Sequence, residues 1–223
     1  LSWTNAVTDL QKAIDLAASG DSIWVAAGMY KPDGEGDSFT ITGAKDGIEI
    51  YGGFKSGDAF DQRDLETNRT ILSGDLDGDD TDPDEDGIIE DADPDGNGTP
   101  ENLSGTNAHH VLILDGGDAI GSNVSANITS ATVIDGVIVT AGHATGSFPN
   151  DSGGGLFCDG TQSGNACSPT LQDVLFAGNA VAGSGGAIFN TGLGGTSNPS
   201  ITNAVFTGNA ANFGGAIFSS GRS

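Results

Sequence analysis

Hydrophobic residues recur along this chain in short runs that glycine, aspartate and asparagine interrupt. Runs of this length, bounded by turn-forming residues, are typical of β-strands. The five that stand out before the repeats lie at residues 22–30, 39–42, 48–51, 70–73 and 111–114. No second helical pattern follows the first twenty residues, and this disfavours a sheet built from alternating strands and helices.

The first twenty residues have a different, helical period. The pattern predicts one amphipathic helix over residues 4–19, with Thr4 as N-cap and Gly20 as its end. Its apolar face would consist of Val7, Leu10, Ile14 and Ala17. A short helix followed at once by a strand is what covers the open end of a β-solenoid, so we expect a capping role.

Residues 130–223 contain the clearest repeats. Similar passages begin at Ile134, Leu171 and Ile201, and each is followed by paired glycines and another apolar run. The last two passages are thirty residues apart, whereas the first aligns with a one-residue insertion that puts His143 in line with the later asparagines. A period near thirty, with two or three short strands in each period, predicts a parallel β-solenoid.

Stacking these repeats at strand spacing makes a definite prediction about neighbours. Leu171 should lie over Ile201 inside the solenoid. Ladders of Phe176 over Phe206 and of Asn179 over Asn209 should form, with the asparagine amides bonding between turns of the chain. We therefore expect an all-β protein, with residues 1–223 as a single domain.

Several motifs resemble those of known families. The runs Asp9–Asp15 and Gly20–Tyr30 resemble the cap and first coil of pectate-lyase-like right-handed parallel β-helix proteins. Tyr51–Phe54 and Thr70–Asp75 are similar to the next coils of large bacterial surface proteins of that superfamily. FxxN motifs at Phe176–Asn179 and Phe206–Asn209, with GGA[ILV] motifs at 185–188 and 214–217, resemble chlamydial polymorphic outer-membrane protein passengers. The resemblance implies a right-handed β-helix and an exported or cell-surface protein, such as a bacterial adhesin.

Charge is concentrated in one segment. The net charge is −24, and thirteen acidic residues lie between Asp75 and Glu101 without any lysine or arginine. We interpret residues 75–107 as an acidic loop insertion. Such a balance excludes nucleic-acid binding through phosphates and attraction to anionic membranes. No apolar run reaches transmembrane length, so membrane insertion is not expected. A hard cation is the partner that this charge favours.

The spacing inside the insertion predicts calcium ligands. Asp82, Asp84 and Asp86 alternate before Gly87, as in D-x-D-x-D-G calcium loops. The carbonyl of Ile88, the ninth residue Glu90 and the twelfth residue Asp93 would complete that loop. The same spacing recurs in two further sets, namely Asp75, Asp77 and Asp79, then Asp93, Asp95 and Asn97. The alternative is a solvated acidic loop that binds no ion.

Two cysteines, Cys158 and Cys167, flank a loop rich in glycine, serine and asparagine. A loop of this composition closes easily, which favours a local disulfide and an exported protein. Two free buried thiols are the alternative.

Catalytic residues are sparse. His109 and His110 are adjacent and would point to opposite faces of a strand, so they make a poor zinc site. Asp135 and Asp173 occupy similar places in successive repeats, as the carboxylate pair of a glycosidase would. Residues 111–221 contain no lysine or arginine to act as the base of a lyase.

Three functions follow from these patterns. The first is a calcium-stabilised module on the outer surface of a bacterium, either structural or binding a glycan or protein. The second is a polysaccharide lyase or glycoside hydrolase. The third is a module that associates end to end, because the last coil has no capping helix after it.

Overall fold

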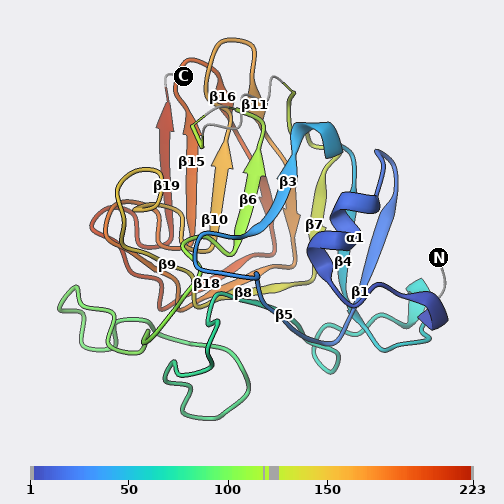
Figure 1. Ribbon diagram of the computed structural model, residues 1–223, viewed down its shortest axis with the longest axis horizontal. Coiled ribbons are helices and arrows are strands. Elements are labelled where there is room, and N and C mark those ends of the chain that lie inside the picture. The colour runs from blue at the N-terminus through green and yellow to red at the C-terminus, as the bar shows by residue number, and fades with distance from the viewer. Residues whose placement is uncertain (1–2, 118, 121–125, 222–223) are drawn as a thin grey trace.

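Short parallel strands stack into three sheets that wind around one core (Figure 1). The structure is a computed structural model that describes residues 3–117, 119–120 and 126–221. In each coil the chain passes from the first sheet to the second and then to the third. This confirms the right-handed parallel β-helix.

Each of the three sheets has five strands. The first contains β1 (Ser22–Ala26), β4 (Glu49–Phe54), β7 (Val133–Asp135), β12 (Thr170–Gln172) and β17 (Ser200–Thr202). The second contains β2 (Gly28–Tyr30), β5 (Thr70–Ser73), β8 (Ile138–Thr140), β13 (Leu175–Ala177) and β18 (Val205–Thr207). The third contains β3 (Phe39–Thr42), β6 (Leu112–Asp115), β10 (Leu156–Asp159), β15 (Ile188–Gly192) and β19 (Ile217–Gly221).

Two small sheets extend the corners between these faces. One pairs β9 (His143–Ala144) with β14 (Ala180–Val181), and the other pairs β11 (Ala166–Cys167) with β16 (Thr196–Ser197). Short 3-10 helices lie at Trp3–Asn5, Gly43–Lys45 and Phe60–Gln62.

The core consists of ladders of equivalent side chains. Leu171 pairs with Ile201 on one side and with Ile134 on the other. The rings of Phe176 and Phe206 stack in parallel, with centroids 5.3 Å apart. Each inward side chain therefore packs on the same position of the next coil, which confirms the ladders predicted from the repeat.

The register corrects one alignment. Ile134 pairs with Leu171 and His143 pairs with Ala180, so both pairs are offset by the same thirty-seven residues. No insertion is needed, and Gly142 rather than His143 lies at the level of Asn179. The extra length lies after β9, in the loops on either side of β10, outside the aligned strands.

The capping helix is shorter than predicted. Helix α1 covers Leu10–Leu16 only, and its N-cap is Asp9, whose carboxylate accepts the N–H of Lys12 at 3.0 Å. Aspartate is a stronger N-cap than threonine, and the Asp9 carboxylate binds a free N–H of the first turn. The helix therefore begins after Asp9 rather than after Thr4. Leu10 and Ile14 are buried against the first coil, so the predicted capping role is confirmed.

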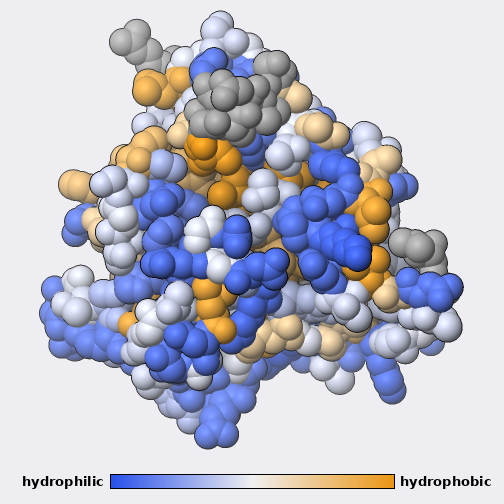
Figure 2. All heavy atoms as spheres, in the orientation of Figure 1, coloured by the Kyte–Doolittle hydropathy of each residue, from blue (hydrophilic) through white to orange (hydrophobic). Residues whose placement is uncertain are grey.

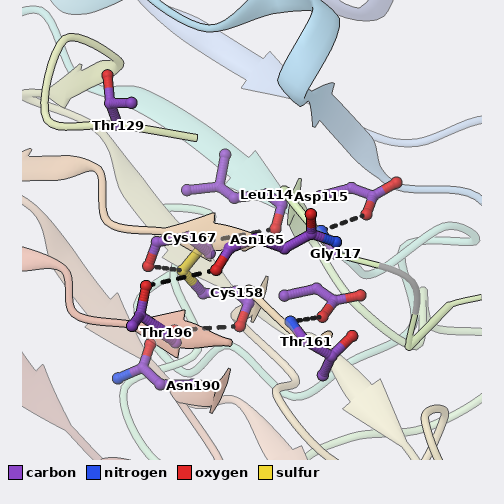
Figure 3. The surroundings of a disulfide bond; sticks show 12 residues. Leu114, Asp115, Gly117, Thr129, Cys158, Thr161, Asn165, Cys167, Asn190 and Thr196 are labelled. Atoms are coloured by element: carbon purple, nitrogen blue, oxygen red, sulfur yellow. Dashed lines mark hydrogen bonds between the residues drawn. A yellow bond between two sulfur atoms is a disulfide. The ribbon is translucent and has the colours of Figure 1, made fainter. Parts of the chain in front are cut away.

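The cysteines form the predicted disulfide. Cys158 in β10 and Cys167 in β11 are bonded, with their Cα atoms 5.7 Å apart. Both are fully buried in the core. Figure 3 shows the bond at the corner beyond the third sheet, beside the hydrogen bond from the Thr196 hydroxyl to the Asn165 carbonyl. The alternative of two free thiols is excluded.

Candidate metal centre

The acidic insertion leaves the solenoid between β5 and β6, at the corner between the second and third sheets. An antiparallel bridge between Asp75 and Asn107 closes its base. The insertion forms the long loops drawn in green below the coils in Figure 1. Figure 2 shows hydrophilic atoms over this part of the surface.

Apolar residues hold the insertion against the outside of the second sheet. Ile88 packs with Ile71 of β5 and Ala177 of β13. Ile89, Ala92 and Leu103 form a second buried cluster, with Ala141 and Ala180. The insertion is therefore a packed part of the fold rather than a solvated excursion.

Hydrogen bonds tie the insertion to two of the coils. The N–H of Ile89 donates to the Thr140 hydroxyl at 3.0 Å, and the N–H of Ala92 donates to the Gly208 carbonyl at 2.9 Å. Gly178 and Gly208 have φ angles of 56° and 52°. A Cβ on Gly178 would clash with the Ile89 carbonyl oxygen, so a glycine there allows the close approach.

The carboxylates of the insertion gather into three groups: Asp75, Asp77 and Asp79; Asp82, Asp84 and Asp86; and Asp93, Asp95 and Glu101. In each group, one oxygen from every residue lies within 4.8 Å of the others. Calcium holds oxygens at 2.3–2.6 Å, so oxygens on its shell lie at most about 5 Å apart. The donor chemistry and spacing of each group thus suit a calcium ion.

Two of the loops fold in the same way. Asp82, at the first position, accepts the N–H groups of Glu85 at 3.0 Å and Gly87 at 2.7 Å. At the corresponding position of the next loop, Asp93 accepts those of Asn97 at 3.2 Å and Gly98 at 2.7 Å. Through these bonds the backbone of each loop folds around its first aspartate.

The fifth residues of these two loops, Asp86 and Asn97, also make similar hydrogen bonds. Asp86 accepts the N–H of Ile88 at 3.0 Å, and Asn97 accepts the N–H of Thr99 at 2.8 Å. Asn97 also donates to Asp95 and Glu101, so it lies within their group. For Ile88, the structure shows a buried side chain, and calcium ligation by its carbonyl stays a prediction.

The grouping differs from the predicted ligand sets at Glu90 and Glu101. Asp93 was predicted in two sets, and it lies with Asp95, as one of them had it, in the third group. Glu101 completes that group and was missed. It is the ninth residue from Asp93, as Glu90 is from Asp82, so the spacing could have revealed it. Glu90 lies outside the three groups. Burial raises the pKa of its carboxyl, and the charges of Asp84 and Asp86 raise it further.

Two basic residues from outside the acidic segment reach the insertion and offset part of its charge. The Arg69 guanidinium forms an ion pair with Asp86. The Lys31 ammonium lies 3.9 Å from the Asp75 carboxylate. Lys31 follows β2 and Arg69 precedes β5, both strands of the second sheet. Only the stacking of coils brings these residues next to the insertion. A cation bound by Asp86 would compete with Arg69.

The carboxyl groups in the first group and at the adjacent Asp80 have different electrostatic environments. Burial raises the pKa of Asp80 to about 6, although the Ser104 N–H and the Asn107 amide donate to its carboxylate. Burial and the charges of Asp77 and Asp75 raise the pKa of Asp79. The Thr106 N–H lowers the pKa of Asp77.

The two candidate catalytic carboxylates have different partners. Asp135 pairs in register with Gln172, and its carboxylate forms a buried ion pair with Arg63. Asp173 lies in the following turn, where it accepts a hydrogen bond from the Asn203 amide at 3.1 Å. Asp135 is therefore already neutralised by a partner, unlike the paired carboxylates of a glycosidase.

The histidines also have separate environments. His110 is buried, which lowers its pKa, and its Nδ1 lies 3.0 Å from the Gly153 carbonyl oxygen. The Nδ1 of His109 lies 3.5 Å from the carbonyl oxygen of His143. No group of three metal-ligating side chains in the described part of the chain includes a histidine.

Residues 173–191 match the family model of the Chlamydia polymorphic membrane protein repeat. This segment runs from the turn before β13 to β15, and it includes Phe176, Asn179 and the paired glycines 185–186. The comparison of the chain with curated proteins and with solved structures gave no match. In the described part of the chain, no helix is long and apolar enough to cross a membrane.

Proposed function

We propose that this chain is a calcium-stabilised β-helical module of an exported or cell-surface protein, with an adhesive or structural role. The repeat match links residues 173–191 to a family of membrane proteins that the motifs already resembled. The buried disulfide supports export, because such bonds persist in oxidising compartments. A glycan or another surface protein is the proposed partner.

One observation carries the proposal. Three groups of carboxylates lie on an insertion that is packed across the outside of the coils through Ile88, Ile89 and Leu103. Carboxylates held so close repel one another, and this repulsion opposes the packing. A divalent ion in each group would remove it and so stabilise the whole solenoid.

Thermal unfolding with and without calcium tests the proposal. Ligand at one hundred times its Kd stabilises a folded protein by about 2.7 kcal/mol. For a domain of this size, that corresponds to a rise in Tm of roughly 5–10 °C. Calcium should also slow proteolytic cutting between residues 75 and 101.

A matched pair of variants locates the effect. Asp84→Asn removes one carboxylate of the second group and should reduce the calcium-dependent rise in Tm. Asp33→Asn, an exposed residue outside the insertion, should leave it unchanged. Equal Tm values in calcium and in EDTA would remove the ion from this function.

A second candidate function is association through the last coil. Within the described part of the chain, strands β17, β18 and β19 lie at the ends of their sheets and pair with a neighbour on one side only. Ile217 continues the inward ladder of Ile188, yet 38% of its surface is exposed. Unpaired strand edges beside exposed core residues favour the addition of further strands.

A further inference from the structure

A groove of about 610 Å³ lies at the other end of the solenoid, between α1, the segment before it and β1. This volume is within the range of small-ligand sites. Its walls include Trp3, Trp24 and Leu16, and its polar residues are Asp21, Ser22 and Asp58. Neither the acidic insertion nor the strands of the last coil contribute to it.

Contacts with neighbouring residues hold the two indole rings in place. Trp24 stacks on the buried ring of Phe54, with centroids 5.1 Å apart and an angle of 6° between the planes. It remains 39% exposed. The Nε1–H of Trp3 donates to the Asp58 carbonyl at 2.9 Å. The aromatic walls are therefore organised before any ligand arrives, which lowers the entropic cost of binding.

Backbone N–H groups also fix the two carboxylates. One oxygen of Asp21 accepts the N–H of Ala18 at 2.8 Å, and one oxygen of Asp58 accepts the N–H of Lys55 at 2.7 Å. Among the described residues, no lysine, arginine or histidine lines the groove or forms an ion pair with either carboxylate. The protein carries a net charge of −24, so its field attracts cations.

We propose that this groove binds the quaternary ammonium group of a small ligand. Aromatic faces attract cations, and tryptophan does so most strongly. Eight of the eleven lining residues are apolar, and they suit methyl groups on nitrogen. A primary ammonium gives up more hydration than a quaternary one, and only the Asp21 and Asp58 carboxylates and the Ser22 hydroxyl could replace its bonds to water. A neutral sugar would gain nothing from the two carboxylates, and an anion would be repelled by them.

Intrinsic fluorescence provides a local test, because Trp3 and Trp24 are the only tryptophans in the chain. The protein is titrated with choline at constant ionic strength and calcium concentration. The control is 3,3-dimethylbutan-1-ol, which has the shape of choline without the charge. We expect a saturable change with choline and binding at least about tenfold weaker for the alcohol.

Paired variants separate local from general charge effects. Asp21→Asn with Asp58→Asn removes both groove carboxylates and should weaken choline binding about tenfold or more. Asp33→Asn with Glu66→Gln removes two exposed charges elsewhere and should leave the affinity within about twofold. Trp24→Ala should abolish most of the binding in protein that keeps its β-sheet circular dichroism.

Three results would overturn the proposal. They are no saturable change with choline up to 100 mM, equal affinity for choline and the alcohol, and equal loss of affinity in the two double variants. Saturable binding of a neutral disaccharide in place of choline would identify the groove as a sugar site instead.

Discussion

Asn179 is fully buried at the corner between the second and third sheets. Its Oδ1 accepts the N–H of Gly142 at 3.0 Å, and its Nδ2 donates to the Val139 and Ala177 carbonyls at 3.0 and 3.1 Å. The amide also donates to the Asn209 Oδ1 at 2.9 Å. One side chain therefore satisfies backbone groups of two coils and contacts the asparagine of a third.

Replacing Asn179 with alanine should be costly. The change leaves the Gly142 N–H and two carbonyls buried without their partner, and each such group costs about 1–3 kcal/mol. We expect the free energy of unfolding to fall by about 3 kcal/mol in chemical denaturation. Asn198→Ala, at an exposed position, should change it by less than about 0.5 kcal/mol. Similar losses in both variants would contradict a special role for the ladder.

The titration of Asp80 gives a second prediction at this scale. Its pKa is raised to about 6 by burial, so the folded state favours the protonated form. Raising the pH from about 4 through 6 ionises Asp80 and should lower the stability of the calcium-free protein relative to Asp80→Asn. Carboxyl NMR should give a midpoint near 6 without calcium. A midpoint near the usual 3.8 would show that the carboxylate is well solvated.

At the scale of elements, the insertion and the second sheet form one packed unit. The turn glycines Gly178 and Gly208 lie against the backbone of the insertion, at Ile89 and Glu90. The composition reveals the acidic segment but does not show that it packs on the coils. Its apolar residues, Ile88, Ile89 and Leu103, were the available signal that it packs on the coils.

Gly178→Ala tests this contact. A Cβ there meets the Ile89 carbonyl and also adopts an unfavourable positive φ of 56°. Gly164→Ala is the matched control, because Gly164 has a φ of 89° with no atom within 4 Å of the added Cβ. Gly178→Ala should lose about 1–3 kcal/mol more stability than the control and expose the insertion to protease. Equal losses would mean that the insertion can move aside freely.

At the scale of the whole molecule, the two ends of the solenoid differ. Helix α1 packs against β1 and β3 at one end, whereas at the other end β17, β18 and β19 each have a paired neighbour on one side only, among the residues that the structure describes. Head-to-tail stacking would require displacement of α1. If copies of this chain associate, the last coils of two molecules should meet, and association should stop at a symmetric pair.

Sedimentation over a range of concentrations tests this pairing. We expect a monomer–dimer equilibrium that Ile217→Lys weakens, because a charge at the exposed end of the core cannot be buried between two copies. Leu193→Lys changes a residue that is 65% exposed in the loop after β15, and it should leave the equilibrium unchanged. A protein that stays monomeric at all concentrations would rule out pairing.

Sequence alone predicted the repeating coils and the ladders Phe176–Phe206 and Asn179–Asn209, delimited the acidic segment by its composition, and favoured the disulfide over two free thiols. Local periodicity, composition and loop length fix these features, and they can be read from neighbouring residues or from a repeat. Only the tertiary structure decided that the insertion packs across the second sheet, that Arg69 pairs with Asp86 and that Trp3 and Trp24 share a groove. These contacts join segments that have no common period, and they arise from the stacking of coils. Their partners are therefore set by the path of the folded chain.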